Sequence, residues 1–272
     1  LAQNFSTAAV TTKGNAALKN EVSNVWTYGA VIQPDFLPGL TFTVDRIEIK
    51  LANALTQVTP DDVMAACYDS TPAAFAASTA CTGGIAFTRD STGQIVAATS
   101  SFLNAAIFQY KGETYNLAYE FDVSDLWGDT VDRGHINANL QATHTEMNNT
   151  QILGNAVTKL AGTAQTTDNA FGNPRWVTKL DIGYSWDALG VSYEMFYLPK
   201  TRVNQTATLA STPYPEVEAN IQHSISAQYV FNDNFTVRAG ITNFTNEKPS
   251  FPLLSYGDAI GRRYFLGINV KY

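Results

Sequence analysis

The sequence predicts an all-β protein, a transmembrane antiparallel β-barrel, and three observations lead to this class. Only 15% of the residues are charged and 12% are aromatic, whereas a soluble domain carries about 25% charged residues. No apolar run approaches the roughly 20 residues that a transmembrane helix needs. Apolar and polar residues instead alternate along many segments, which is the pattern of strands with one apolar face. Strands that expose every second residue to lipid produce this composition.

The last segment, 262–272, shows the alternation most clearly. One of its faces carries only aromatic and aliphatic side chains, namely Tyr264, Leu266, Ile268, Val270 and Tyr272. Its length suits a tilted strand that crosses a bilayer, and we expect it to be the strand that seals a barrel. Taken alone, it could equally be the last strand of a soluble sandwich. The lengths of the connections between strands distinguish these two fold classes.

Nine segments have the alternation and the length of membrane-crossing strands. They cover residues 22–32, 39–51, 105–123, 134–147, 174–187, 189–201, 219–231, 234–245 and 262–272. The links between them alternate between short, turn-rich segments and long ones, and the long ones are 52–103, 148–173, 202–218 and 246–261. This alternation is typical of outer-membrane barrels, which have tight periplasmic turns and long extracellular loops. The sequence therefore predicts a location in the bacterial outer membrane, in contact with its lipid.

The number of strands predicts on which side of the membrane each end of the chain lies. If 246–261 lies outside, the C-terminus is periplasmic and residues 1–21 form an extracellular loop segment. A bacterial single-chain barrel has an even number of strands, and an open sheet edge in lipid leaves unpaired backbone groups at a cost of several kcal/mol each. We therefore expect residues 22–272 to be the C-terminal portion of a larger barrel, whose remaining strands come from the same protein or from a companion chain.

The long extracellular loop predicted over 52–103 contains both cysteines, Cys67 and Cys81. A disulfide that closes so short a segment would stabilise by about 3 kcal/mol and would indicate an oxidising compartment. Two unrelated free thiols are the alternative. One short helix is expected just before Cys67, because Thr59 is a good N-cap and Pro60 suits the first helical position.

The inventory of reactive side chains argues against an enzyme. The chain has three histidines, and the alternation places none of them beside a nucleophile. No Cys/His cluster has the spacing of a metal site, and a net charge of -7 argues against nucleic acid as a partner. The sequence therefore predicts no catalytic residue, no metal ligand and no cofactor.

Two groups of polar or aromatic residues are candidates for contact with a solute. On the face opposite the apolar one, the charged residues are Lys179, Asp181, Glu194 and Arg238. They could line a solute path, or they could form a hydrated charge network that braces the wall. In the outer loops, the candidates are Tyr214, Phe251, Tyr256, Asp258 and Arg262. Aromatic residues in the apolar phase, such as Trp176 and Trp186, are instead expected to form interfacial girdles.

Residues 14–55 resemble the mid-barrel signature of TonB-dependent outer-membrane receptors, in which a G-N-P-x-L-K-P-E stretch precedes an E-x-S-x-x-W/Y-x-x-G strand. The matching residues are Gly14, Asn15, Leu18, Lys19, Glu21, Ser23, Trp26 and Gly29. Ala16 and Asn20 replace the usual prolines. Residues 241–251 and 257–272 resemble the end of the same barrel, with Tyr264 and Gly267 in place and Tyr272 where the family has Phe. The loop that holds Cys67 and Cys81 is also similar to an outer loop of one large subgroup.

This resemblance implies a 22-strand barrel occluded by an N-terminal plug, with a short segment before the plug that contacts TonB. The present chain would supply about the last nine strands, and the plug and the TonB contact would lie in a part that is absent from it. The implied function is energy-coupled uptake of a scarce solute, such as a siderophore, vitamin, oligosaccharide or peptide, through gating by the plug. The alternative is a structural or anchoring component of the outer membrane without transport activity.

Overall fold

The computed structural model describes residues 9–67, 71–77, 81, 85–92, 94–126, 128, 130–164 and 172–271. The chain packs into two compact units, each of which is described by itself. The first unit comprises Leu1–Val25, Glu48–Tyr110 and Asn148–Lys159, and the second comprises Trp26–Ile47, Lys111–Met147 and Leu160–Tyr272.

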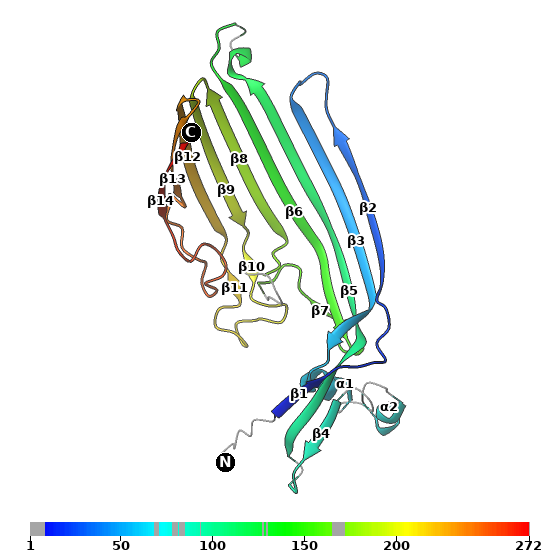
Figure 1. Cartoon of the computed structure of the whole chain (residues 1–272). Coiled ribbons are helices and arrows are strands. Elements are labelled where there is room, and N and C mark those ends of the chain that lie inside the picture. The colour runs from blue at the N-terminus through cyan, green and yellow to red at the C-terminus, as the bar shows by residue number, and fades with distance from the viewer. Residues whose placement is uncertain are drawn as a thin grey trace. The chain divides into compact units, whose positions relative to one another are not determined.

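Nine long strands form one sheet, in which each strand pairs with the next long strand along the chain (Figure 1). They are β2 (Val22–Ile32), β3 (Leu40–Gln57), β5 (Ile95–Asp122), β6 (His135–Ile152), β8 (Trp176–Trp186), β9 (Leu189–Leu198), β12 (Asn220–Asn232), β13 (Phe235–Thr242) and β14 (Arg263–Val270). From β6 to β14 every pairing is antiparallel. All nine predicted strands are thus confirmed. β2 and β14 stand at the two ends of the order, so the sheet is open in this chain.

The hairpin of β8 and β9 shows how alternation becomes a two-faced sheet. Its two-residue turn begins at Asp187, whose φ of 48° is a conformation that Asp tolerates better than most residues. The resulting register pairs Ile182 with Tyr193 and Asp181 with Glu194. Because successive side chains point to opposite faces, apolar residues gather on one face, here called the apolar face, and polar residues gather on the other, here called the polar face.

The apolar face of β14 is open to the surroundings in this chain. Tyr264, Leu266 and Ile268 are 70%, 72% and 62% exposed. A contiguous apolar surface of this kind requires a partner phase such as lipid. β14 confirms the strand expected at the end of the chain, although Tyr272 lies outside the described residues.

The first unit holds two short helices, α1 (Pro60–Cys67) and α2 (Pro72–Ala77), where the sequence predicted only one. The hydroxyl of Thr59 accepts a hydrogen bond from the amide of Asp62 (3.2 Å), and the Asp62 carboxylate accepts one from the amide of Thr59 (2.9 Å). This reciprocal capping starts α1 as expected. A disulfide joins Cys67 to Cys81 across a Cα–Cα distance of 5.5 Å. Cys67 packs with Val58 and Val63 in the small core of this unit.

The strands of the first unit extend farther than the alternation predicted. β3 continues to Gln57, β5 begins at Ile95 and β6 continues to Ile152. Three further strands pair with the extensions of β5 and β6. They are β1 (Ala9–Lys13) and β4 (Ile85–Arg89), which pair with β5, and β7 (Thr158–Lys159), which pairs with β6. Parts of the segments expected as loops, 1–21 and 52–103, are therefore strand. Threonine-, serine- and alanine-rich stretches carry little hydrophobic alternation, and the ladder hydrogen bonds decide their structure instead.

In the second unit, a hydrophobic cluster lies where the strands meet the long connections. It contains Ala164, Leu198, Val217 and Tyr256, all buried. Beside it, the two-residue strands β10 (Thr201–Arg202) and β11 (Glu216–Val217) pair with each other. A short 3₁₀ turn, η1 (Val123–Leu126), follows β5 in one of the short connections. No helix in the described part of the chain has the length and apolar character needed to cross a membrane.

Candidate functional site

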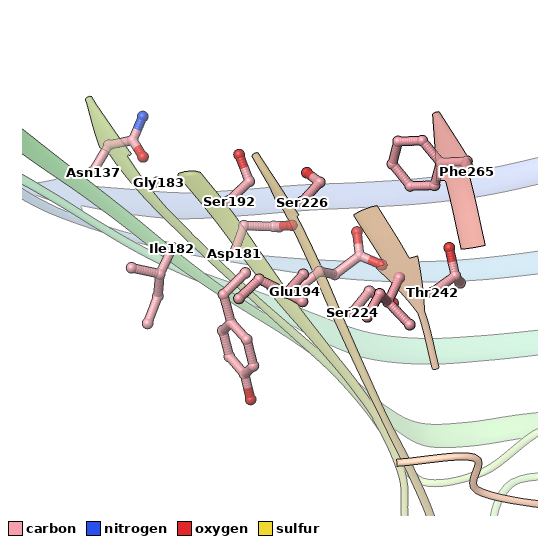
Figure 2. Close-up of a pocket in the computed structure, with 13 residues that line it drawn as sticks. Asn137, Asp181, Ile182, Gly183, Ser192, Glu194, Ser224, Ser226, Thr242 and Phe265 are labelled. Carbon is pink, nitrogen blue, oxygen red and sulfur yellow. The ribbon is translucent and has the colours of Figure 1, made fainter. Parts of the chain in front are cut away.

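The register of the second unit aligns polar side chains in rows across four strands. One row runs from Asn137 through Gly183 and Ser192 to Ser226. The neighbouring row contains Asp181, Glu194 and Ser224. Figure 2 shows Asn137, Ser192 and Ser226 on one side of the sheet and Ile182 on the other. The polar face is therefore continuous over β6, β8, β9 and β12.

An open hollow of about 310 Å³ lies on this face (Figure 2). Two glycines make room for neighbouring side chains, Gly183 in the first row and Gly240 on β13, which pairs with Ser226. A Cβ on Gly183 would collide with the amide of Asn137, and a Cβ on Gly240 would come within 2.6 Å of the ring of Phe265. The hollow is lined by amide, hydroxyl and carboxylate groups and also by the ring of Phe265, so its lining is polar over β6 to β12 and aromatic at β14.

Three of the four predicted charged residues of the polar face come together. The ammonium of Lys179 lies 3.1 Å from a carboxylate oxygen of Asp181 and 2.9 Å from one of Glu194. All three side chains are roughly half exposed, so water screens their attraction and each pair contributes at most about 1 kcal/mol. One ammonium faces two carboxylates, which leaves this cluster with one excess negative charge.

Arg238, the fourth predicted residue, stands apart from that cluster. It pairs in register with Gln228 on one side and Gly267 on the other. Its guanidinium carbon lies 6.0 Å from the centroid of the Phe265 ring, at the limit of a cation–π contact. Arg238 lines a second hollow of about 220 Å³ on the same face. The structure therefore presents an acidic cluster and a separate arginine.

The predicted loop residues occupy three different environments. Tyr214 and Phe251 meet edge to face with ring centroids 4.6 Å apart, and both are well exposed. Arg262 donates its backbone amide to the side chain of Asn246 (3.1 Å). Asp258 accepts hydrogen bonds from the guanidinium of Arg263 and from the amide of Ile260. The Arg263 guanidinium holds the pKa of the Asp258 carboxyl below its usual range.

Tyr256 is fully buried, unlike the other predicted loop residues. Its ring packs in the cluster with Leu198 and Val217, and its hydroxyl donates a hydrogen bond to the carbonyl of Pro199. Burial raises the pKa of this phenol well above its ordinary value. In this position Tyr256 anchors the connection 243–262 against the strands.

Sequence reasoning missed a charged cluster where the apolar face ends. Arg46 forms ion pairs with Glu113 and with Glu146, the latter at 2.6 Å. His144 lies 2.7 Å from the other Glu113 oxygen, and its ring stacks on Trp176 with centroids 4.5 Å apart. The sequence contained a signal for this cluster, because its charged residues occupy alternating positions that carry apolar side chains elsewhere in the same strands. Their charges mark the place where that face stops being apolar.

The three histidines have separate partners in the structure. His135 lies 3.1 Å from Asp122, His144 lies beside Glu113, and Nδ1 of His223 lies 2.7 Å from the hydroxyl of Tyr193. Within the described ranges, no group of three or more His, Cys, Asp or Glu side chains has the arrangement of a metal site.

Comparisons with solved structures identify the fold. The siderophore receptor PirA from Acinetobacter baumannii is 14% identical with a TM-score of 0.59, and the alignment covers 96% of this chain and 33% of that one. The ferric enterobactin receptor PfeA from Pseudomonas aeruginosa is 13% identical with a TM-score of 0.58, covering 96% and 32%. The outer membrane transporter YddB from Escherichia coli is 10% identical with a TM-score of 0.55, covering 98% and 35%. The chain thus spans about a third of the length of these proteins.

Sequence comparison identifies the family. A search of curated proteins found no match. Residues 1–244, however, match the family described as "TonB dependent receptor-like, beta-barrel". The open antiparallel sheet of nine long strands agrees with a part of such a barrel. The chain belongs to the TonB-dependent receptor β-barrel family.

Proposed function

We propose that this chain is the C-terminal portion of the barrel of an outer-membrane transporter that takes up a scarce solute by energy-coupled gating. The observation that carries the proposal is the open sheet of nine long strands in a chain of this family. The rest of the barrel, the plug and the segment that contacts TonB would lie elsewhere in the same protein or in a companion chain.

The proposed orientation places the short turns in the periplasm and the long connections outside the cell. Trp176 and Trp186 stand at opposite ends of β8 on the apolar face. Ten residues of strand rise about 34 Å, or about 26 Å along the membrane normal at a tilt of ~40°. This separation agrees with the aromatic girdles of an outer-membrane barrel, whose apolar band is about 25 Å tall.

A labelling experiment in intact cells tests this orientation. Leu209 lies in a long connection and is 80% exposed, whereas Asp233 lies in the short turn between β12 and β13. Cysteine variants of the whole receptor, Leu209→Cys and Asp233→Cys, are treated with a membrane-impermeant maleimide. We expect labelling at 209 in intact cells and at 233 only after the outer membrane is opened. The reverse pattern would overturn the orientation.

The solute path proposed here has two parts. Tyr214 and Phe251 present exposed aromatic surface in the long connections, where a solute would first bind, with Asp258 and Arg262 close by in sequence. The acidic cluster of Lys179, Asp181 and Glu194, followed by Arg238, lines the wall that the solute or the plug would face. The buried Tyr256 supports the first part without touching the solute.

Siderophores are the solute class to test first, since PirA is named as a siderophore receptor and PfeA as a ferric enterobactin receptor. A strain that lacks the whole receptor is complemented with the wild-type gene or with a variant carrying Tyr214→Ala and Phe251→Ala. Uptake of radiolabelled iron from a panel of ferric siderophores is then measured with and without TonB. We expect TonB-dependent uptake that the double variant lowers at least tenfold.

A matched control is Leu254→Ala, which removes another exposed apolar side chain from the same connection. Its uptake should stay within about twofold of wild type. If the receptor gives no TonB-dependent uptake of any siderophore, vitamin, oligosaccharide or peptide tested, the transport proposal fails. A structural or anchoring role in the outer membrane is then the better explanation.

A further inference from the structure

A histidine at the end of the apolar face, His144, lies between a carboxylate and an aromatic ring. Its Nδ1 is 2.7 Å from an oxygen of Glu113, and its ring stacks on Trp176 with centroids 4.5 Å apart. His144 and Trp176 also pair in register on the neighbouring strands β6 and β8. One imidazole therefore contacts side chains from both strands that flank its own, β5 and β8.

The carboxylate of Glu113 is held from two sides. Its other oxygen forms an ion pair with Arg46 on β3, and the same guanidinium lies 2.6 Å from Glu146 on β6. The side chains of Glu113, Arg46 and His144 are only 13%, 22% and 24% exposed. Water therefore screens their contacts less than it screens the half-exposed ion pairs of the polar face.

The protonation state of His144 changes the strength of both its contacts. An ionised carboxylate only accepts hydrogen bonds, so Nδ1 carries a hydrogen in the contact with Glu113. A hydrogen bond from an imidazolium to a carboxylate is roughly twice as strong as one between neutral groups. A cation close to the face of an indole ring is also attracted to it, and the ring of Trp176 is within that range. Both contacts of His144 are therefore stronger when the imidazole is protonated.

The other charged groups around His144 come from each neighbouring strand. On β3, the cation Arg46 is balanced by the two carboxylates that it binds. Arg175, just before β8, donates a hydrogen bond to the backbone carbonyl of Glu146 (3.2 Å). Two residues beyond Arg46 and Glu113 on the same strands are one acid and one base, Glu48 and Lys111. Among the described charged residues, Glu113 alone lies within ion-pair distance of the imidazole, so its negative charge has the largest effect.

We propose that His144 is a pH-sensitive clamp that holds the start of β8 to β5 and β6 more firmly in acid. Because the protonated imidazole makes the stronger contacts, the clamp is strongest at low pH. It weakens as the pH rises through the range in which histidine titrates, about pH 5 to 8. The backbone is tied at the same place, since the carbonyl of Arg175 accepts a hydrogen bond from the amide of Thr145 (2.8 Å).

The clamp gives the wall a property that goes beyond transport of a solute. In the proposed orientation, the start of β8 follows a long connection on the outer side, so the clamp would respond to the pH outside the cell. The chain that enters β8 would then be held more firmly in an acidic environment. The contacts that carry the inference do not depend on the identity of the solute.

The test measures backbone hydrogen exchange of the purified whole receptor in detergent at pH 5.5 and pH 8.0. The variant is His144→Asn, whose side-chain amide can still donate a hydrogen bond to Glu113 but cannot gain a proton. The matched control is His223→Asn. It removes another histidine whose Nδ1 lies beside a neutral group, the hydroxyl of Tyr193 (2.7 Å). Each variant is compared with wild type at the same pH, so the pH dependence of intrinsic exchange cancels.

The measured quantity is the exchange rate of the variant divided by that of wild type, over residues 143–147 and 175–178. For His144→Asn we expect this ratio to be about fivefold larger at pH 5.5 than at pH 8.0, because local opening costs more in wild type when the imidazole is charged. For His223→Asn the ratio should change by less than twofold. An equal ratio for His144→Asn at both pH values, or an equal change in the control, would overturn the proposal.

A second measurement uses only the wild-type receptor, in case His144→Asn fails to fold. Protection from exchange, corrected for the intrinsic rate, should fall about fivefold between pH 5.5 and pH 8.0 over residues 143–147 and 175–178. Over residues 222–225, around His223, it should change by less than twofold. Equal changes in these segments, or no fall in the first two, would overturn the proposal. Solute uptake is not measured in either experiment, so a failure of the transport proposal leaves this test intact.

Discussion

At the scale of single residues, Tyr256 shows how one side chain can determine the place of a long connection. The sequence presented it as one more loop aromatic that could meet a solute. The structure buries it completely and gives its hydroxyl the carbonyl of Pro199 as acceptor. Asn243 and Ser250 are buried in the same connection, and the Asn243 side chain bonds the backbone of Glu247 at both its amide nitrogen and its oxygen. The connection 243–262 is thus held by side chains at several points.

Tyr256→Phe tests the anchoring role. The variant keeps the ring but removes the part-buried hydrogen bond to the Pro199 carbonyl, a loss of about 1 kcal/mol. Because the effect is local, we expect hydrogen exchange over 243–262 to accelerate about fivefold, with little change in global unfolding. Tyr214→Phe, which alters an exposed ring, is the control. Unchanged exchange in Tyr256→Phe would argue that the connection is held elsewhere.

The pair of Asp258 and Arg263 predicts a pH dependence in the same connection. Since Arg263 lowers the pKa of Asp258 in the folded state, the pair stabilises above the unfolded pKa of about 3.9. This contribution is lost as the pH falls through the lower folded value. We expect wild type to show more exchange protection over 243–262 than Asp258→Asn at pH 7. The difference should vanish in acid, below the folded pKa. An equal difference at both pH values would contradict the assignment.

At the scale of elements, each long strand has one face for lipid and one for water. The hairpin of β13 and β14 pairs Leu266 with Ala239 on the apolar face and Asn269 with Thr236 on the polar face. The alternation in the sequence predicted this division correctly. It did not predict the ends of β3, β5 and β6, because the extended parts do not alternate between apolar and polar residues. The pairing of β1 and β4 with β5, and of β7 with β6, depends on long-range hydrogen bonds.

Leu266→Lys in the whole receptor tests the two-faced character of β14. A cation on the lipid face near the membrane centre costs about 2–4 kcal/mol. We expect less folded receptor in the outer membrane, measured by surface labelling and by the heat-resistant folded band in gel electrophoresis. Asn269→Lys, on the opposite face of the same strand, should assemble at nearly the wild-type level. Equal losses in both variants would mean that the strand has no lipid-facing side.

At the scale of the whole molecule, the decisive feature is that the order of strands has two ends. β2 and β14 do not pair with each other in the described part of the chain. In lipid, an unpaired strand edge leaves backbone groups without hydrogen-bond partners. The nine-strand sheet therefore needs further strands before it can form a stable wall.

This requirement gives a direct prediction for the isolated chain. Expressed alone and refolded in detergent, residues 1–272 should aggregate or stay partly unfolded, whereas the whole receptor should unfold cooperatively at a defined temperature. Circular dichroism and size-exclusion chromatography make the comparison. Supplying the remaining strands as a second polypeptide should restore a single folded species. If the isolated chain were monodisperse and unfolded cooperatively, the prediction would be wrong. The edges at β2 and β14 would then have to be covered in some other way.

The sequence alone determined the class of this protein, its nine long strands and the face to which most side chains point, because a period of two is a local property of the chain. It also indicated the capped helix α1. The tertiary structure decided what depends on residues far apart in sequence. In the tertiary structure Lys179 pairs with Glu194, Arg238 lies apart from this pair, and Tyr256 is buried. The tertiary structure also brings Glu113, His144 and Trp176 together. Register and loop packing bring such residues together, and neither is visible in the alternation of a single strand.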